Sequence, residues 1–343
     1  MRNKYPIVLL RSDGGYAAQE FFKGIRFSSH CEYKLSGFHK DYENFSFPHI
    51  RKYNEDLREN LDLVFEFEKN NYSIGKSEII VVPLIQKFFL KNIVYKKKLD
   101  ILSLIDYVRN PSGQFEYVCS ITKKKFPIYD KLPIEIFIKD LDAKLNSYLV
   151  FAKTITIKII EFKKETEGYF ELQINHVSPA WHLYRSIGIN LPLLIMQTQL
   201  GRNVSTYPMV NYEDLLVSGL DIKYKMKNKK IFWFDLDETL ICRDTPVFQL
   251  IDILNIFLKN KKVVSLLTRH TYEISKTLEK INLSIEIFND IVKVEGDQLK
   301  SFYVNVDDVF VDNEYPQRLD VRKNTNAMVL DLDQIDFIDF NSF

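Results

Sequence analysis

Residues 229–242 read KKIFWFDLDETLIC, and this stretch decides how the rest of the chain is interpreted. Four large apolar residues, Ile231–Phe234, end on Asp235, and a second carboxylate follows at Asp237. An uninterrupted apolar run of this kind is typical of a strand buried on both faces inside a parallel sheet. Open α/β sheets bind ligands at the carboxyl ends of such strands. Two like charges this close favour a cation between them, and Mg²⁺ is the usual one.

Three segments further along the chain carry matching features. Val263–Leu267 is another apolar run, and it ends on Thr268 in SLLTRH. A lysine, Lys300, lies in GDQLKSF, and the short apolar run Val309–Val311 ends on Asp312 in VFVDNEYPQR. The carboxyl ends of parallel strands meet at one edge of a sheet, so these side chains are expected near the first two carboxylates.

Taken in this order, the four segments resemble the motifs of the haloacid dehalogenase (HAD) superfamily, most of whose members are Mg²⁺-dependent phosphotransferases. The resemblance covers about residues 229–343 and implies an α/β fold with a Rossmann-like parallel sheet. The intervals Asp237–Thr268 and Thr268–Lys300 each hold one helix and its loops, which leaves no room for an inserted cap domain. We therefore expect an uncapped, open site.

The resemblance also implies a role for each motif residue. Asp235 would be the nucleophile that becomes an aspartyl phosphate, and Asp237 would be the general acid and base. Thr268 would donate a hydrogen bond to the phosphoryl group, and Lys300 would supply a positive charge to it. The Mg²⁺ ligands implied are Asp235, the backbone carbonyl of Asp237, and Asp312.

Two of these residues have alternatives. Thr268 could instead be the N-cap of a helix expected over residues 271–280, since threonine is a common N-cap. Lys293 could take the place of Lys300, although Lys300 lies nearer the fourth motif.

The fourth motif departs from the family pattern at one position. Asn313 stands where a second acid is often found. One acid can still hold the metal, with Glu314 or Asp308 as possible additional ligands.

The N-terminal part predicts a second α/β layer. Pro6–Leu10 is a predicted strand, followed by a Gly14–Gly15 turn and a helix over residues 16–24. The turn could bind an anion or be a plain tight turn. Residues 54–69 have the spacing of an amphipathic helix, and Glu78–Val82 is the next predicted strand. Alternating strands and helices favour a parallel sheet.

Residues 169–201 resemble the end of an ATP-grasp domain. A predicted strand, Tyr169–Asn175, precedes Gly188-Ile-Asn-Leu-Pro192 and a helix closed by Gly201. ATP-grasp enzymes use an acid as a Mg²⁺ ligand where this chain has Gln173, and only Asn175 is kept. Because an amide binds Mg²⁺ more weakly than a carboxylate does, this part is interpreted as a degenerate ATP-grasp-like domain.

Composition limits the possible partners. The 343 residues carry a net charge of +1 from 47 basic and 46 acidic side chains, which gives no general electrostatic case for nucleic acid or an anionic membrane. The basic, aromatic segment 87–98 could bind nucleic acid, but a solvated face is the simpler interpretation. Three widely spaced cysteines and the lack of an apolar run near ~18 residues predict a cytoplasmic protein without a zinc site. His176 and His182 are interpreted as surface residues or as hydrogen-bonded residues near a loop.

These observations predict residues 1–205 as the ATP-grasp-like domain, residues 206–228 as a solvated linker, and residues 229–343 as the HAD-like domain. The expected function is a Mg²⁺-dependent phosphohydrolase in biosynthesis that acts on a phosphorylated small molecule, with residues 1–205 selecting the substrate. One alternative is a non-catalytic module that binds a phosphorylated ligand. Another is an ATP-dependent carboxylate ligase fused to a HAD domain.

Overall fold

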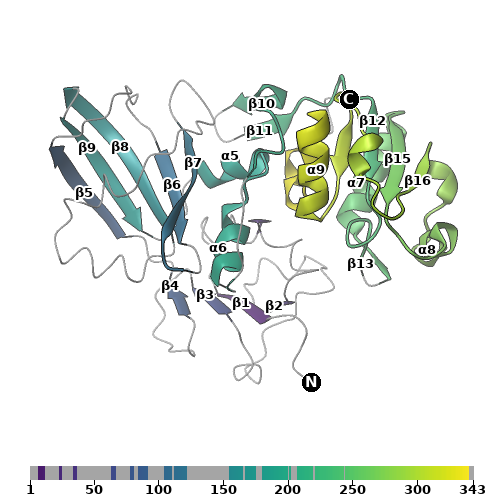
Figure 1. Cartoon of the computed structure of the whole chain (residues 1–343), viewed down its shortest axis with the longest axis horizontal. Helices are drawn as coiled ribbons and strands as arrows, with labels where there is room; N and C mark the ends of the chain where they lie inside the picture. The colour runs from purple at the N-terminus through teal and green to yellow at the C-terminus, as the bar shows by residue number, and fades with distance from the viewer. Residues whose placement is uncertain are drawn as a thin grey trace. The chain divides into compact units, whose positions relative to one another are not determined.

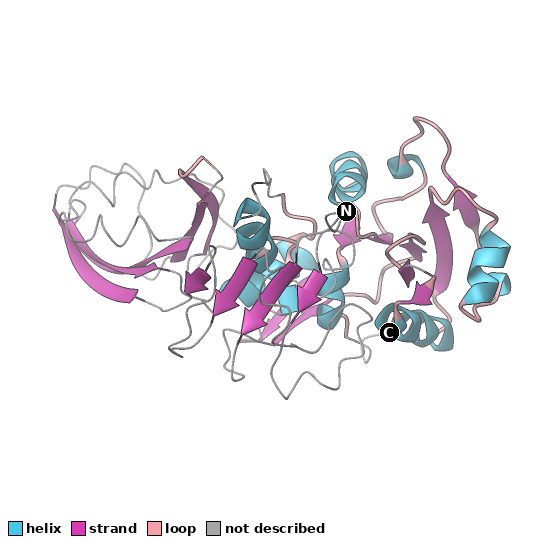
Figure 2. Cartoon of the chain, turned by 90° about the horizontal axis from the view of Figure 1, so that it is seen from below, coloured by secondary structure: helices cyan, strands magenta, loops and turns pink. Residues whose placement is uncertain are grey.

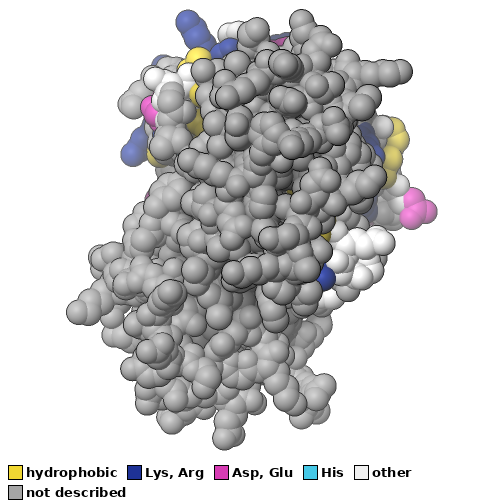
Figure 3. Space-filling view, turned by 90° about the vertical axis from the view of Figure 1, so that its left-hand side faces the viewer, with side chains coloured by type: hydrophobic (Ala, Val, Ile, Leu, Met, Phe, Trp, Pro, Cys, Tyr) yellow, Lys and Arg dark blue, Asp and Glu magenta, His cyan; other side chains and the backbone are white. Residues whose placement is uncertain are grey.

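The structure is a computed structural model, and the chain divides into two compact units (Figure 1). Unit 1 comprises Met1–Arg26, Tyr33–Tyr184 and Asn190–Thr206, and unit 2 comprises Phe27–Glu32, Arg185–Ile189 and Tyr207–Phe343. The structure describes residues 7–11, 23–24, 34–36, 63–66, 78–80, 84–91, 104–109, 112–121, 154–164, 167–174, 180–199, 201, 207–218, 221–242 and 244–339. Much of the face shown in Figure 3 belongs to residues outside these ranges.

A four-stranded parallel sheet in unit 1 has the order β2-β1-β3-β4. Its strands are β1 (Ile7–Arg11), β2 (Lys34–Ser36), β3 (Leu63–Glu66) and β4 (Glu78–Ile80). The parallel layer predicted for this part is therefore present.

The helix predicted over residues 54–69 is wrong at residues 63–66, which form β3. Leu63, Val64 and Phe65 are contiguous apolar residues, and such a run suits a buried strand better than one face of a helix. The Gly14–Gly15 turn and the remainder of the two predicted helices lie almost wholly outside the described residues.

A five-stranded antiparallel sheet also belongs to unit 1, with the order β5-β9-β8-β6-β7. Its strands are β5 (Leu84–Lys91), β6 (Leu104–Arg109), β7 (Phe115–Ile121), β8 (Thr154–Lys164) and β9 (Glu167–Ile174). Gln173 lies in β9 opposite Thr156 and Ile85, and Asn175 lies outside the described residues.

Two helices follow, α5 (Ala180–Ser186) and α6 (Leu191–Gln199). Asn190 caps α6, because its Oδ1 accepts a hydrogen bond from Leu193 N at 3.1 Å. Gly201 follows the helix with φ +76°, a conformation that favours glycine. The helix end predicted from Gly201 is confirmed.

The sheet of unit 2 is five-stranded and entirely parallel, in the order β16-β15-β12-β17-β18. Figure 1 labels β12, β15 and β16 of this sheet. Its strands are β12 (Ile231–Phe234), β15 (Val263–Thr268), β16 (Ile291–Lys293), β17 (Val309–Val311) and β18 (Met328–Leu330). The three apolar runs quoted from the sequence are all strands of this sheet. The chain is thus a mixed α/β protein with a parallel sheet.

Helices cover both faces of this sheet (Figure 2). Trp233 of β12 belongs to a core cluster that includes Val321 of α9 (Tyr315–Thr325). On the opposite face Phe232 and Phe234 pack against Phe257 of α7 (Phe248–Lys259), with ring centroids 4.2 and 6.2 Å apart. Successive strand residues point to opposite faces, which explains why β12 is apolar at every position.

The strand order creates a switch point in the middle of the sheet. From β12 the chain runs outward to β15 and β16, and it then returns to the other side of β12 to form β17 and β18. Crevices at the carboxyl ends of strands form where the order reverses, here between β12 and β17. Asp235 follows β12 at this point, and Asp312 follows β17.

The segment 206–228 differs from the expected solvated linker. It contains a short 3₁₀ helix and an antiparallel strand pair, η3 (Tyr212–Asp214), β10 (Leu215–Ser218) and β11 (Asp221–Tyr224). Met209, Tyr224 and Met226 are buried, and the Tyr224 hydroxyl donates to Ser186 O at 2.7 Å. These residues bury apolar side chains, so they form part of the core of unit 2.

Among the described residues, no helix has the length and apolar character needed to cross a bilayer.

Candidate functional site

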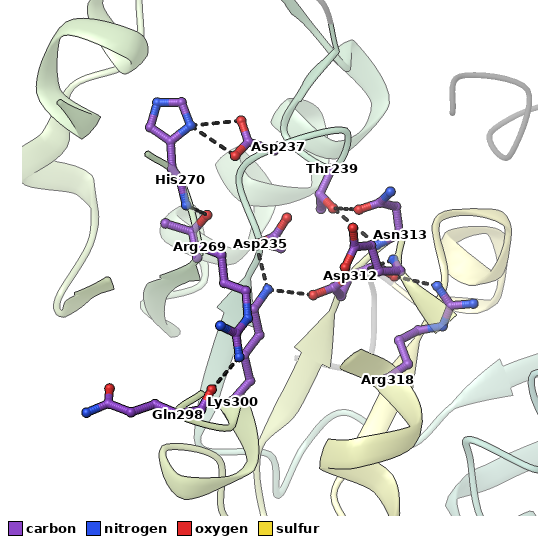
Figure 4. A network of polar contacts seen from close by, with 12 residues as sticks. Asp235, Asp237, Thr239, Arg269, His270, Gln298, Lys300, Asp312, Asn313 and Arg318 are labelled. Atoms are coloured by element: carbon purple, nitrogen blue, oxygen red, sulfur yellow. Dashed lines mark hydrogen bonds and ion pairs between the residues drawn. The ribbon is translucent and has the colours of Figure 1, made fainter. Parts of the chain in front are cut away.

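The centre of the site is a buried ion triad at the switch point (Figure 4). Lys300 opens the 3₁₀ helix η5 (Lys300–Phe302), and its Nζ lies 2.7 Å from Asp235 Oδ1 and 2.7 Å from Asp312 Oδ2. All three residues are buried, with exposed fractions of 2% for Lys300, 6% for Asp235 and 0% for Asp312. The structure therefore brings together three of the predicted site residues.

One ammonium group does not compensate two buried carboxylates. Burial and the charge of Asp312 raise the pKa of Asp235 to about 7, although Lys300 opposes both effects. Burial lowers the pKa of Lys300, but the charges of Asp312 and Asp235 outweigh it, so the net pKa of Lys300 is raised. Lys300 thus stays charged, and the two carboxylates carry an excess of negative charge once Asp235 ionises above about pH 7.

Lys293, the alternative to Lys300, lies elsewhere. Its side chain is exposed, and Nζ donates to Thr271 O at 3.2 Å. Only Lys300 of these two lysines reaches the carboxylates.

Thr268 is the last residue of β15 and is fully buried. Its Oγ1 accepts a hydrogen bond from His270 N at 3.2 Å. The alternative that Thr268 caps the following helix is wrong, because α8 (Ile274–Lys280) has Glu273 at its N-cap. A hydroxyl that accepts one hydrogen bond can still donate its own hydrogen, which is what the predicted phosphoryl contact requires.

Asp237 points away from the triad (Figure 4). Its Oδ1 and Oδ2 lie 2.8 and 3.0 Å from His270 Nδ1, and its side chain is 55% exposed. The Asp237 carboxylate therefore does not join Asp235 and Asp312 at Lys300. As a metal ligand, the resemblance implies only the backbone carbonyl of Asp237 and not its carboxylate.

His270 is the site residue that the sequence did not single out. Its ring is 5% exposed, and Nε2 lies 2.7 Å from Thr277 Oγ1, which in turn donates to Glu273 O at 3.2 Å. The available signal was its place two residues after Thr268, at the carboxyl end of β15.

A pocket of about 650 Å³ opens beside this pair. Asp237 and His270 line it together with Thr277, and Tyr272 forms another part of its wall. The Tyr272 ring meets His270 edge to face, at a centroid distance of 5.7 Å, and remains 76% exposed. The pocket could therefore hold the part of a substrate that lies next to Asp237.

The loop that carries Asp312 is held by its neighbours. Asp312 Oδ1 accepts from Glu314 N at 2.6 Å, and Arg318 Nη1 donates to Asp312 O at 2.8 Å. Arg318 is itself buried and forms an ion pair with Asp331 at 2.5 Å. These contacts fix the direction of the Asp312 carboxylate.

Arg269 anchors the loop that precedes Lys300. Its Nη1 donates to Gly296 O at 2.8 Å, and its Nη2 donates to Gln298 O. The guanidinium group thus joins the end of β15 to the segment that brings Lys300 into the triad.

The two possible additional metal ligands, Asp308 and Glu314, both lie apart from the triad. Asp308 lies before β17, where its carboxylate accepts hydrogen bonds from Trp233 Nε1 at 3.3 Å and Asn305 N at 2.8 Å. It is therefore at the opposite end of the strand from Asp312. Glu314 is exposed at the start of α9, and its backbone amide is the group that contacts Asp312.

The donor set can be compared with the needs of Mg²⁺. Within the described ranges, no group of three or more His, Cys, Asp or Glu side chains could hold a metal ion. The expected set contains only two carboxylates, Asp235 and Asp312, with a backbone carbonyl. Mg²⁺ commonly binds through one or two carboxylates and keeps several waters. Hard oxygen donors with excess negative charge fit that description.

The chain matches no model of a known protein family and no curated protein. Among solved structures, the crystal structure of phosphoribosylaminoimidazole carboxylase ATPase subunit from Aquifex aeolicus is similar in part. The similarity covers 61% of this chain and 84% of that chain, at 12% sequence identity and a TM-score of 0.37. Similarity at this level does not establish a shared fold, so the ATP-grasp and HAD resemblances stay predictions.

Proposed function

We propose that unit 2 is a HAD-type, Mg²⁺-dependent phosphohydrolase that acts on a phosphorylated small metabolite. The observation that carries the proposal is the buried triad in which Asp235 and Asp312 share Lys300 at the switch point of a parallel sheet. A buried excess of negative charge lowers the stability of the fold. Its presence is accounted for if the site binds a cation together with a phosphoryl group.

In the proposed reaction the Asp235 carboxylate attacks phosphorus and the bond to the leaving oxygen breaks. Asp237 donates a proton to that oxygen. Water then attacks the phosphorus of the aspartyl phosphate and gives its proton to Asp237, which releases inorganic phosphate and restores Asp235. The Lys300 ammonium offsets negative charge on the phosphoryl oxygens, and the Thr268 hydroxyl donates a hydrogen bond to one of them.

Asp235, Asp312 and the backbone carbonyl of Asp237 are the groups that would hold Mg²⁺. When bound, Mg²⁺ would add positive charge next to the transferring phosphoryl group. Lys300 contacts one oxygen of each carboxylate, and Asp312 Oδ1 also accepts from Glu314 N. Because each carboxylate oxygen has two lone pairs, both carboxylates can still bind a cation.

The test is phosphate release from p-nitrophenyl phosphate and from a panel of phosphorylated metabolites, with Mg²⁺ and with chelator. We expect release that requires Mg²⁺, that is lost in Asp235→Asn, and that is kept in the exposed control variant Lys293→Gln. Release that persists in Asp235→Asn would reject the aspartyl phosphate.

A non-catalytic phospho-ligand module is the second candidate. It is favoured by the direction of Asp237, whose carboxylate contacts His270 and not the triad. A protein of this kind would bind a phosphorylated metabolite in calorimetry and would release no phosphate from it.

The ATP-dependent carboxylate ligase concerns unit 1 and stays the least favoured alternative. The similar solved structure is that of an ATPase subunit, but the similarity is too weak to argue from. ATP binding that is unaffected by Asn175→Ala would count against a ligase. That residues 1–205 select the substrate also stays a prediction.

A further inference from the structure

We propose that His270 is the residue that positions Asp237 for protonation of the leaving group, and that Thr277 fixes the His270 ring for this purpose. The inference rests on the proposed function, and it assigns a role to a residue to which the resemblance gives none. His270 makes contacts with both of its ring nitrogens.

His270 is held at both ring nitrogens and at its backbone N. Its Nδ1 contacts both oxygens of Asp237, at 2.8 and 3.0 Å, and its Nε2 lies 2.7 Å from Thr277 Oγ1. The backbone of the same residue donates to Thr268 Oγ1 at 3.2 Å. A buried imidazole with this many partners has one orientation, and so it restricts where the Asp237 carboxylate can lie.

A row of hydrogen bonds joins Asp237, His270 and Thr277. The contact of 2.8 Å between His270 Nδ1 and the Asp237 carboxylate needs one hydrogen between the two groups. At the other ring nitrogen, Nε2 lies 2.7 Å from Thr277 Oγ1, and the same hydroxyl lies 3.2 Å from Glu273 O. The Asp237 carboxylate is thus tied to a ring that is held from its far side as well.

This arrangement has the form of a general acid held by an orienting partner. A catalytic acid works when it lies within hydrogen-bonding reach of the oxygen it protonates, and a second group commonly fixes its direction. Asp237 and His270 line the same pocket. Asp237 follows Asp235 by two residues, and His270 N donates to Thr268 Oγ1. The leaving group would therefore lie in this pocket, with its oxygen towards Asp237.

The test compares two substrates of nearly the same shape, phenyl phosphate and p-nitrophenyl phosphate. Phenolate is the poorer leaving group, so its departure depends more on protonation by Asp237. In His270→Phe we expect kcat for phenyl phosphate to fall about 10- to 100-fold. The fall should exceed that for p-nitrophenyl phosphate by at least about tenfold, with a smaller change in KM. His270→Asn keeps a donor near the Nδ1 position and should recover most of this difference.

Two further measurements make the outcome decisive. Thr277→Val removes the hydroxyl that contacts His270 Nε2 and Glu273 O, and it should show the same substrate bias to a smaller degree. This variant covers the case in which His270→Phe does not fold. In the metal-free protein, Asp237→Asn should shift the Nδ1 nitrogen resonance of His270 in a long-range proton–nitrogen NMR spectrum. His182→Asn is the matched control and should produce neither effect.

Equal losses on the two substrates, or no recovery in His270→Asn, would overturn the positioning role and leave the phosphohydrolase intact. If the wild-type protein hydrolyses neither these two substrates nor any phosphorylated metabolite of the panel, the proposed function fails and this role fails with it. The NMR shift would then report only that the two side chains are paired.

Discussion

Thr239 and Asn313 exchange two hydrogen bonds. Thr239 Oγ1 donates to Asn313 Oδ1 at 3.2 Å, and Asn313 N donates to Thr239 Oγ1 at 3.2 Å. Thr239 follows the first carboxylate pair and Asn313 follows Asp312, so this contact joins the loops after β12 and β17 (Figure 4). Asn313, which departs from the family pattern, thus has a structural role of its own.

Substitution of Asn313 tests this contact. Asn313→Ala removes the acceptor for the buried Thr239 hydroxyl, and we expect the free energy of unfolding to fall by about 1–2 kcal/mol. Mg²⁺ affinity should weaken as well, because the loop that carries Asp312 loses a tether. Denaturant unfolding and calorimetry measure the two effects. Asn324→Ala, in an exposed helix position, is the control, and an equal change there would contradict the prediction.

Removal of Lys300 leaves two buried carboxylates without their shared cation. We expect Lys300→Met to lower the free energy of unfolding by about 3–5 kcal/mol in the absence of metal, since a buried ion pair is broken on one side. Saturating Mg²⁺ should restore part of this loss. Urea unfolding with and without Mg²⁺ checks both statements. The exposed Lys293→Met should be nearly neutral, and a similar loss in both variants would reject the role of burial.

The shifted pKa of Asp235 gives a direction for the effect of pH. Its pKa is raised by burial from 3.8 to about 7, so the folded protein binds a proton that the unfolded chain has already released between these values. The stabilising contribution of this proton is complete below pH 3.8 and is lost as the pH rises to about 7. In metal-free buffer, the stability of the wild type relative to Asp235→Asn should decrease over this interval. The prediction would be contradicted if this stability difference did not change with pH. It would also be contradicted if the difference changed no more than it does for the exposed Asp290→Asn.

The carboxyl ends of β12, β15 and β17 could be predicted because these strands are covered on both faces. With Phe232 and Phe234 against α7 and Trp233 against the α9 side, the apolar run is continuous and stops where the ligand edge begins. Asp235, Thr268 and Asp312 could be located because each stands at or directly after the end of such an apolar run. Lys300 lies on no strand, and only its resemblance to a motif pointed to it.

Two features escaped prediction for different physical reasons. Residues 221–227 have a period of two, with Ile222, Tyr224 and Met226 buried between lysines, but the lysines suggested a solvated linker. This pattern is that of a half-buried strand. The Asp237–His270 contact was not visible because a side-chain direction depends on tertiary packing, here the Thr277 hydroxyl of α8.

Asp308 and Asp312 flank β17 and offer a matched pair of substitutions with opposite expectations. Asp308 accepts hydrogen bonds from Ile231 N, Trp233 Nε1 and Asn305 N at the amino end of the strand, so it holds the sheet together. Asp308→Ala should lower the free energy of unfolding by about 2–3 kcal/mol, because buried donors lose their acceptor, and Mg²⁺ affinity of the folded protein should change little.

Asp312→Asn should show the reverse pattern. The amide can still accept from Glu314 N, so most of the loop geometry is kept, but one negative charge leaves the triad. With less repulsion at Asp235 the metal-free protein should lose little stability, whereas Mg²⁺ binding and phosphate release should drop at least about tenfold, because a neutral amide is a weaker ligand. Calorimetric Mg²⁺ titrations of both folded variants separate the two roles. If Asp308→Ala weakened Mg²⁺ binding as much as Asp312→Asn does, the carboxyl edge of β17 would not be the place where the cation binds.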